Sequence, residues 1–150
     1  MSFKTYSLVF MFDERDNVAL IHKNRPDNLA GKLNGIGGKA EPGESMLETA
    51  IREVREEAAV ELNERQLHCC LTFERPNYTI HVWSARLTPE QWGDIKTMTD
   101  EQVVIVPYSE LFYNGVGLKL DWHSVVFLQA AYKDLRRGDP ASHIRWSPTP

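Results

Sequence analysis

The chain has 150 residues, of which 42% are hydrophobic and 25% charged, and its formal net charge is −4 at pH 7. This length predicts a single domain (residues 1–150) with a core of its own. The negative charge argues against a general nucleic-acid-binding protein, which usually carries a basic face. The apolar runs are too short to span a membrane, there is no secretory signal pattern, and Cys69 and Cys70 suggest no disulfide or metal motif. We therefore expect a cytoplasmic protein that binds neither nucleic acid nor a membrane.

The first part of the chain predicts a hairpin followed by a loop. Residues 6–12 are rich in aromatic and β-branched side chains, the polar residues 13–17 favour a turn, and residues 18–22 predict a second strand. Residues 23–39 contain a proline and four glycines, so we expect a loop there. This segment is also basic. It is either a surface loop with scattered lysines or a site at which basic side chains and exposed amides bind phosphate.

A helix is predicted directly after this loop. Ser45 followed by Glu48 is typical of a helix N-terminus, and apolar residues at 47, 50, 51, 54 and 58 predict one buried side. Glu53, Glu56 and Glu57 are spaced i, i+3 and i+4. Residues at this spacing are neighbours on a helix, so three carboxylates are expected to project from one patch.

Two interpretations of this acidic patch remain open from the helix alone. Like charges at helical spacing oppose each other by roughly 0.2–0.5 kcal/mol per pair. The patch is either a solvated acidic surface, partly compensated by Arg52, or the binding site of a hard divalent cation. Magnesium prefers carboxylate oxygens, keeps several waters and often brings phosphate into its coordination shell.

The second half of the chain predicts more strands and two further helices. Residues 66–73 and 78–87 are expected to form strands around a turn at 75–77, Thr88 to begin a short helix, and residues 103–106 to form a strand. A helical turn is expected within 107–112. Asp121 is expected to cap the last helix, whose buried side is formed by residues 125, 128, 132 and 135 and whose end is set by Gly138 and Pro140. Residues 141–150 are expected to be irregular. Together, the predicted elements indicate a mixed β-sheet with a few helices packed against it.

The region 38–60 resembles the Nudix box. Its residues follow the pattern G-x5-E-x7-R-E-U-x-E-E-x-x-U, where U is apolar, beginning at Gly38 and ending at Val60. That box is the signature of hydrolases acting on nucleoside diphosphates linked to another moiety. One position departs, because Ala59 stands where the family usually has glycine. Glycine suits a left-handed residue at the helix end, and alanine there costs about 1–2 kcal/mol if the geometry is kept.

The resemblance implies an α/β fold, specifically an α/β/α sandwich with a mixed sheet and a loop–helix–loop catalytic motif. It also implies Mg²⁺, or Mn²⁺, as the cofactor. By resemblance, Glu53, Glu56 and Glu57 are the principal metal ligands, with the backbone of Gly37 or Gly38 completing the shell. Arg52 is expected to orient a neighbouring glutamate, and Glu44 to be a supporting acid.

The general base has two candidates, because members of the family differ. One is Glu53 within the box. The other is Glu101, in the loop before the strand at 103–106, where the family often has an acid; it is expected to act as a base or an additional metal ligand. An ordinary turn residue is the alternative interpretation of Glu101.

Substrate contacts are expected on both sides of the box. Lys23, Arg25 and Lys39 are candidates for binding phosphate. Asn34 resembles the asparagine that touches the base in the branch containing oxidised-purine nucleoside triphosphatases. That branch also uses acids near its last helix, where this chain has Asp121, although a capping role explains Asp121 at least as well. Four aromatic residues are candidates either for stacking on a base or for the core: Phe73, Tyr78, Trp83 and Trp122. No role is assigned to His22, His81 or His123.

The leading hypothesis is a Mg²⁺-dependent hydrolase that cleaves the pyrophosphate bond of a nucleoside diphosphate linked to another moiety, such as ADP-ribose, a dinucleotide or FAD, and releases a nucleoside monophosphate. A nucleotide-pool-sanitising pyrophosphatase acting on normal or oxidised nucleoside triphosphates is the alternative within this class. A non-catalytic nucleotide sensor is the alternative outside it, disfavoured because such a domain has no need of mutually repelling acids. The expected partner is a small nucleotide, and a homodimer is compatible with the sequence.

Overall fold

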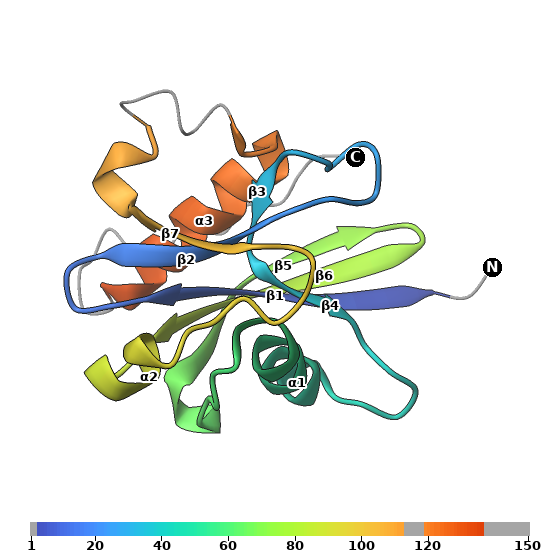
Figure 1. Ribbon diagram of the computed structural model, residues 1–150. Helices are drawn as coiled ribbons and strands as arrows, with labels where there is room; N and C mark the ends of the chain where they lie inside the picture. The colour runs from blue at the N-terminus through green and yellow to red at the C-terminus, as the bar shows by residue number, and fades with distance from the viewer. Residues whose placement is uncertain (1–2, 113–118, 137–150) are drawn as a thin grey trace.

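A computed structural model describes residues 3–112 and 119–136. Figure 1 shows the arrangement of its helices and strands. Two short 3₁₀ turns also occur, at Glu64–Gln66 and Tyr108–Glu110. In chain order the elements are β1 (Lys4–Phe12), β2 (Asn17–His22), β3 (Leu33–Asn34), β4 (Ile36–Lys39), α1 (Met46–Ala58), β5 (Leu67–Arg75), β6 (Tyr78–Arg86), α2 (Pro89–Gly93), β7 (Val103–Pro107) and α3 (Trp122–Leu135).

The strands form one mixed, open sheet organised around β1. The order is β3-β2-β1-β6-β5, with β4 also paired to β1 and β7 to β2. β1 runs parallel to β6 and antiparallel to β2 and β4. The residues around Tyr6–Val9 pair with β4, whereas Met11 and Phe12 pair with β2. The sheet therefore diverges along β1, and β4 contacts α1 at Glu53 and Glu57.

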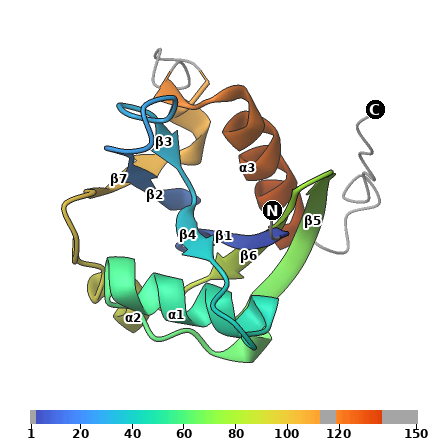
Figure 2. The ribbon, with the colours of Figure 1, turned by 90° about the vertical axis from the view of Figure 1, so that its right-hand side faces the viewer.

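Helices cover both faces of this sheet. Alternation along β1 directs Val9 and Met11 into a core shared with α1, and Phe10 and Phe12 into a second core shared with α3; all four are fully buried. In Figure 2 the sheet lies between α1 and α2 on one side and α3 on the other. The predicted α/β/α sandwich with a mixed sheet is confirmed. In the described part of the chain, no helix is both long and apolar enough to cross a membrane.

The prediction of a loop over residues 23–39 is wrong in its second half, which contains β3 and β4. Glycine composition favoured a loop, but here glycine permits a strand to approach its neighbour closely. A Cβ atom added at Gly37 would lie 1.9 Å from the backbone oxygen of Ser7 in β1. The same residues that suggested irregular structure therefore allow β4 to pair with β1.

The ends of α1 agree with the sequence. The Ser45 hydroxyl accepts a hydrogen bond from the Glu48 amide at 3.1 Å. At the other end, Ala59 has φ 60° and ψ 24°, and its amide donates to the Arg55 carbonyl at 3.1 Å. The left-handed helix end is therefore kept although the residue is not glycine.

The last helix begins as predicted, and its most buried residues are shifted by about one position from the predicted ones. Asp121 caps it by accepting from the Ser124 amide at 2.9 Å. The fully buried residues are Ser124, Phe127, Leu128 and Ala131, whereas the predicted Val125, Tyr132 and Leu135 are only partly buried. Val125, Tyr132 and Leu135 pack against the same core from beside this stripe, because α3 is apolar around much of its circumference. The expected end at Gly138 and Pro140 and the tail at 141–150 lie outside the described residues.

Candidate active site

Helix α1 turns two of its glutamates toward the backbone of β4. The Gly37 amide donates to Glu57 Oε2 at 3.2 Å. A Cβ atom added at Gly38 would lie 2.5 Å from Glu53 Oε1. A side chain at position 38 would therefore displace the Glu53 carboxylate, whereas position 37 must be glycine because the backbone of β1 lies against it.

Arg52 connects the acids of this region. Its Nε and Nη2 contact the two oxygens of Glu44 at 2.7 and 3.0 Å, and Nη1 contacts Glu53 at 2.9 Å and Glu56 at 3.1 Å. Nη2 also donates to the carbonyl of Lys39 at 3.0 Å. These hydrogen bonds lower the pKa of Glu44 to about 2. Arg52 thus contacts the neighbouring Glu53 while two of its nitrogens bind Glu44.

The two inward glutamates carry poorly compensated charge. Burial, and then the charge of Glu53, raise the pKa of Glu57 to about 7, against the opposing effects of Lys23 and the Gly37 amide. Burial also raises the pKa of Glu53, although Arg52 opposes the shift. A cation between these carboxylates would stabilise their ionised forms.

Glu56 lies apart from this pair. Its side chain is 54% exposed, and it contacts Arg52. Among the described residues, no group of three or more acidic, histidine or cysteine side chains is assembled as a metal site. Glu53 and Glu57 are both turned toward β4, whereas Glu56 shares Arg52 Nη1 with Glu53 at a more exposed position. The donor set still fits magnesium, which is commonly bound by one or two carboxylates together with waters and substrate phosphates.

Glu101 lies beside this pair, in the loop before β7. Its side chain is 6% exposed, with Oε1 2.8 Å from Lys23 Nζ and Oε2 accepting from the Asn24 amide at 2.7 Å. Burial acts to raise the pKa of Glu101, but the hydrogen bonds from Lys23 and Asn24 outweigh it, so the pKa is lowered. The charges of Glu101 and Lys23 both act on the pKa of Glu57. The loop acid therefore lies close to the box, with both oxygens engaged.

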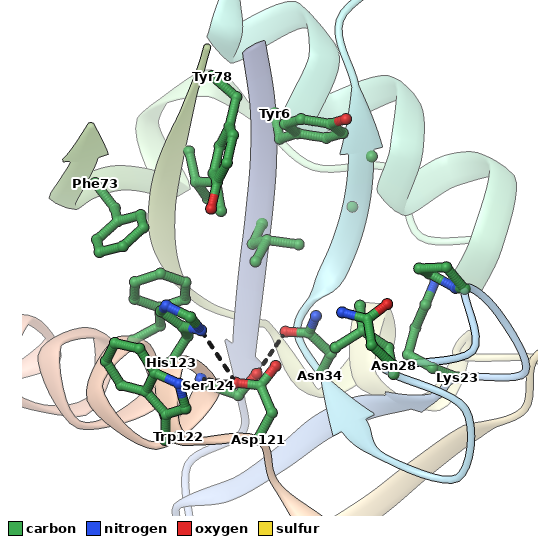
Figure 3. A pocket seen from close by; sticks show the side chains of 17 residues that line it. Tyr6, Lys23, Asn28, Asn34, Phe73, Tyr78, Asp121, Trp122, His123 and Ser124 are labelled. Carbon is green, nitrogen blue, oxygen red and sulfur yellow. Dashed lines mark hydrogen bonds and ion pairs between the residues drawn. The ribbon is translucent and has the colours of Figure 1, made fainter. Parts of the chain in front are cut away.

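A cavity of about 610 Å³ borders the same stretch of β4, between the sheet and the N-terminus of α3 (Figure 3). Gly37 and Gly38 line it, so these two glycines border both the cavity and the glutamates of α1. Aromatic side chains from β1, β5, β6 and α3 contribute to its walls: Tyr6, Phe73, Tyr78, Trp122, His123 and Phe127. Trp122 is 62% exposed, and its ring lies 3.5 Å from that of His123. Such faces are suited to stacking on a nucleobase.

The end of the cavity formed by β3 and α3 is polar. Asn34 Oδ1 accepts from the Gly35 amide at 2.7 Å and from the Ser124 hydroxyl at 2.9 Å. Asp121 Oδ1 caps α3 and lies 3.8 Å from His123 Nδ1. Figure 3 shows these side chains gathered at one end of the cavity.

Of the predicted substrate contacts, Lys23, Asn34 and Asp121 line the cavity, whereas Arg25 and Lys39 do not. Arg25 instead forms an exposed ion pair with Asp100. The exposed Lys39 side chain lies at the end of β4, and the Lys39 carbonyl accepts from Arg52.

Sequence reasoning missed several cavity residues, among them Tyr6, His123 and Ser124. They lie on elements that only the tertiary fold brings together. Two features of the sequence could have indicated them. His123 and Ser124 lie within three residues of the candidate Asp121, and Tyr6 lies on the strand that pairs with β4.

The sequence model of the NUDIX domain family matches residues 3–124. Since this is most of the chain, the protein belongs to that family.

Solved structures show the same fold. A MutT from work on Aliivibrio salmonicida and Vibrio cholerae has a TM-score of 0.68 and 16% identity, with 87% of this chain and 98% of that chain covered. The ORF135 protein of E. coli has a TM-score of 0.66 and 22% identity, with 94% of this chain and 96% of that chain covered. A bifunctional NMN adenylyltransferase/ADP ribose pyrophosphatase from Francisella tularensis, complexed with AMP and a Mn ion, has a TM-score of 0.69 and 16% identity. The match covers 88% of this chain but only 42% of the Francisella tularensis chain. At these identities the likeness concerns the fold.

Proposed function

We propose that this protein is a divalent-metal-dependent nucleotide pyrophosphatase that cleaves a phosphoanhydride bond and releases a nucleoside monophosphate. One observation carries the proposal: Gly37 and Gly38 border both the carboxylates of α1 and the aromatic cavity. A nucleotide whose base lies in the cavity would extend its phosphates along β4 toward Glu53 and Glu57.

Each residue has a task in this proposal. Glu53 and Glu57, with the backbone of Gly37 or Gly38, would hold Mg²⁺ or Mn²⁺, and Glu56 would join them by turning away from Arg52. The bound ion supplies an activated water and neutralises charge on the phosphate oxygens. Arg52, held by Glu44, keeps Glu53 in place. Lys23 lines the cavity and is suited to bind phosphate.

The base that accepts the proton from water is Glu53 or Glu101. Glu53 has a raised pKa and lies against β4. Glu101 would first have to leave Lys23 and the Asn24 amide. We therefore propose Glu53 as the base and Glu101 as the residue that holds Lys23 at the cavity.

Two substrate classes fit the site. The first is a nucleoside diphosphate linked to another moiety, whose second group would extend beyond the cavity. The second is a nucleoside triphosphate, which needs one set of base contacts such as Asn34, Asp121 and the aromatic walls provide in the described cavity. A cytoplasmic location and a homodimer stay predictions.

The test is hydrolysis of a panel of nucleotides in the presence of Mg²⁺ or Mn²⁺, with products identified by mass. The panel contains nucleoside triphosphates, oxidised dGTP, ADP-ribose, NADH, FAD and diadenosine polyphosphates. Release of a nucleoside monophosphate supports the proposal, and Glu53→Gln should lower kcat by orders of magnitude while leaving Tm close to that of the wild type. Tight nucleotide binding without turnover of any compound would instead identify a sensor domain.

A further inference from the structure

Thr49 is a fully buried polar residue in the first half of α1 that has no task in the proposed function. Its hydroxyl oxygen lies 2.7 Å from Glu44 Oε1 and 2.9 Å from the carbonyl oxygen of Ser45. A threonine within a helix often donates to the carbonyl four residues earlier. A hydroxyl has one proton, however, and the carboxylate is the nearer acceptor and the charged one. Thr49 therefore donates to Glu44.

This hydrogen bond fixes the rotation of the Glu44 carboxylate. Oε1 also accepts from Arg52 Nη2 at 3.0 Å and from the Glu41 amide at 3.1 Å, while Oε2 accepts from Arg52 Nε at 2.7 Å. Among these donors, only the Thr49 hydroxyl belongs to a fully buried side chain. With Oε1 held by Thr49, Oε2 is directed at Arg52 Nε.

Arg52 divides its guanidinium group between Glu44 and two other acids. Two of its nitrogens bind Glu44, so that only Nη1 contacts Glu53, at 2.9 Å, and Glu56, at 3.1 Å. A guanidinium group binds a carboxylate most strongly through two parallel N–H groups. If Glu44 turned away, Arg52 could form such a two-fold pair with Glu53. The positive charge of Arg52 would then compete with a metal ion for the Glu53 carboxylate.

We propose that Thr49 is a positioning residue: by fixing Glu44 against two nitrogens of Arg52, it limits Arg52 to a single contact with Glu53 and leaves Glu53 available to the cation. This inference rests on the proposed function, since it takes Glu53 to be a metal ligand. Thr49 does not line the described cavity, so nucleotide binding should not depend on it.

The test is Mn²⁺ binding without nucleotide, measured by the electron paramagnetic resonance of free Mn²⁺. Thr49→Val keeps nearly the same shape but loses the hydroxyl, and we expect Kd for Mn²⁺ to rise about threefold to tenfold. Thr49→Ser keeps the hydroxyl and should bind Mn²⁺ like the wild type.

Ser84→Ala is the matched control. Ser84 is also fully buried, and its hydroxyl donates to the Asp134 carboxylate at 2.6 Å, on the α3 side of the sheet. Ser84→Ala and Thr49→Val each remove one buried hydrogen bond to a carboxylate, so Tm should fall in both. Only Thr49→Val should weaken Mn²⁺ binding, because only this hydroxyl acts on Arg52 through Glu44.

Two further measurements follow the path of the effect. Glu44→Gln alone should raise Kd for Mn²⁺ at least as much as Thr49→Val, and combining the two should give no additional increase, because both act through the same carboxylate. In the metal-free protein, the NMR signal of Arg52 Nε–H should move in Thr49→Val, whereas AMP binding in EDTA should be unchanged.

Four results would overturn the inference: an unchanged Kd for Mn²⁺ in Thr49→Val, an equal rise in Ser84→Ala, a Thr49→Ser variant as weak as Thr49→Val, or a wild type that binds no Mn²⁺. Nucleotide hydrolysis by the wild type together with one of the first three results would leave the proposed function standing without this inference. Absence of hydrolysis, with Mn²⁺ binding weakened selectively in Thr49→Val, would instead refute the pyrophosphatase activity and leave this inference standing.

Discussion

Replacing Glu57 by glutamine should flatten the pH dependence of stability in the metal-free protein. The pKa of Glu57 is about 7 in the folded state against 4.5 for an ordinary glutamate, because of burial and the charge of Glu53. A carboxyl whose folded pKa is raised ionises first in the unfolded chain. The free energy of unfolding therefore falls as pH rises from about 4.5 to about 7 and stays reduced above that.

The size of the effect follows from the two pKa values. A difference from 4.5 to about 7, at about 1.4 kcal/mol per pKa unit, corresponds to at most about 3 kcal/mol, of which roughly 2 kcal/mol is lost between pH 5 and pH 8. For a domain of this size, such a loss lowers Tm by about 4–8 °C.

Thermal unfolding in EDTA at pH 5 and pH 8 measures this directly. The wild type should lose several degrees more than Glu57→Gln, and Glu14→Gln, in the exposed turn after β1, should follow the wild type. Adding Mg²⁺ at pH 8 should restore stability in the wild type but not in Glu57→Gln. Parallel pH profiles for the wild type and Glu57→Gln would refute the view that Glu57 is a buried, poorly compensated acid.

Three further predictions follow from the geometry. Ala59→Gly should raise the free energy of unfolding by up to about 1 kcal/mol in chemical denaturation, because it removes left-handed strain but adds freedom to the unfolded chain; a destabilised variant would contradict this. Gly38→Ala should reduce kcat more than tenfold, since the new Cβ would displace Glu53, whereas Gly93→Ala, which meets no atom within 4 Å, should leave kcat unchanged. Trp122→Ala should raise KM on the order of tenfold without lowering Tm, because this exposed ring is available to stack on a base; an unaltered KM would remove it from the site.

The acidic helix was predictable because its signals are local. Ser45 caps α1, the apolar side is buried, and the i, i+4 spacing of Glu53 and Glu57 directs both toward β4. Spacing could not predict that Glu56 would remain exposed beside Arg52. A helix period fixes the direction of a side chain, whereas its rotamer depends on the neighbours with which it pairs.

The cavity was much less predictable, because it is made by tertiary contacts. Glycines at 37 and 38 look like loop residues until β1 is seen to lie against them. Asn34 was identified through its resemblance to a family residue, but its orientation depends on Ser124, 90 residues away along the chain. Local patterns therefore predicted the acids, and long-range packing determined the cavity.

The central claim is that Glu53 and Glu57 hold a divalent cation at the edge of the nucleotide cavity. The most direct measurement is an anomalous difference map from crystals grown with Mn²⁺ and a non-hydrolysable nucleotide. We predict a peak between these two carboxylates and the backbone of Gly37 and Gly38, in contact with the phosphates. A peak elsewhere, or ordered phosphates beside an empty pair of glutamates, would contradict the account.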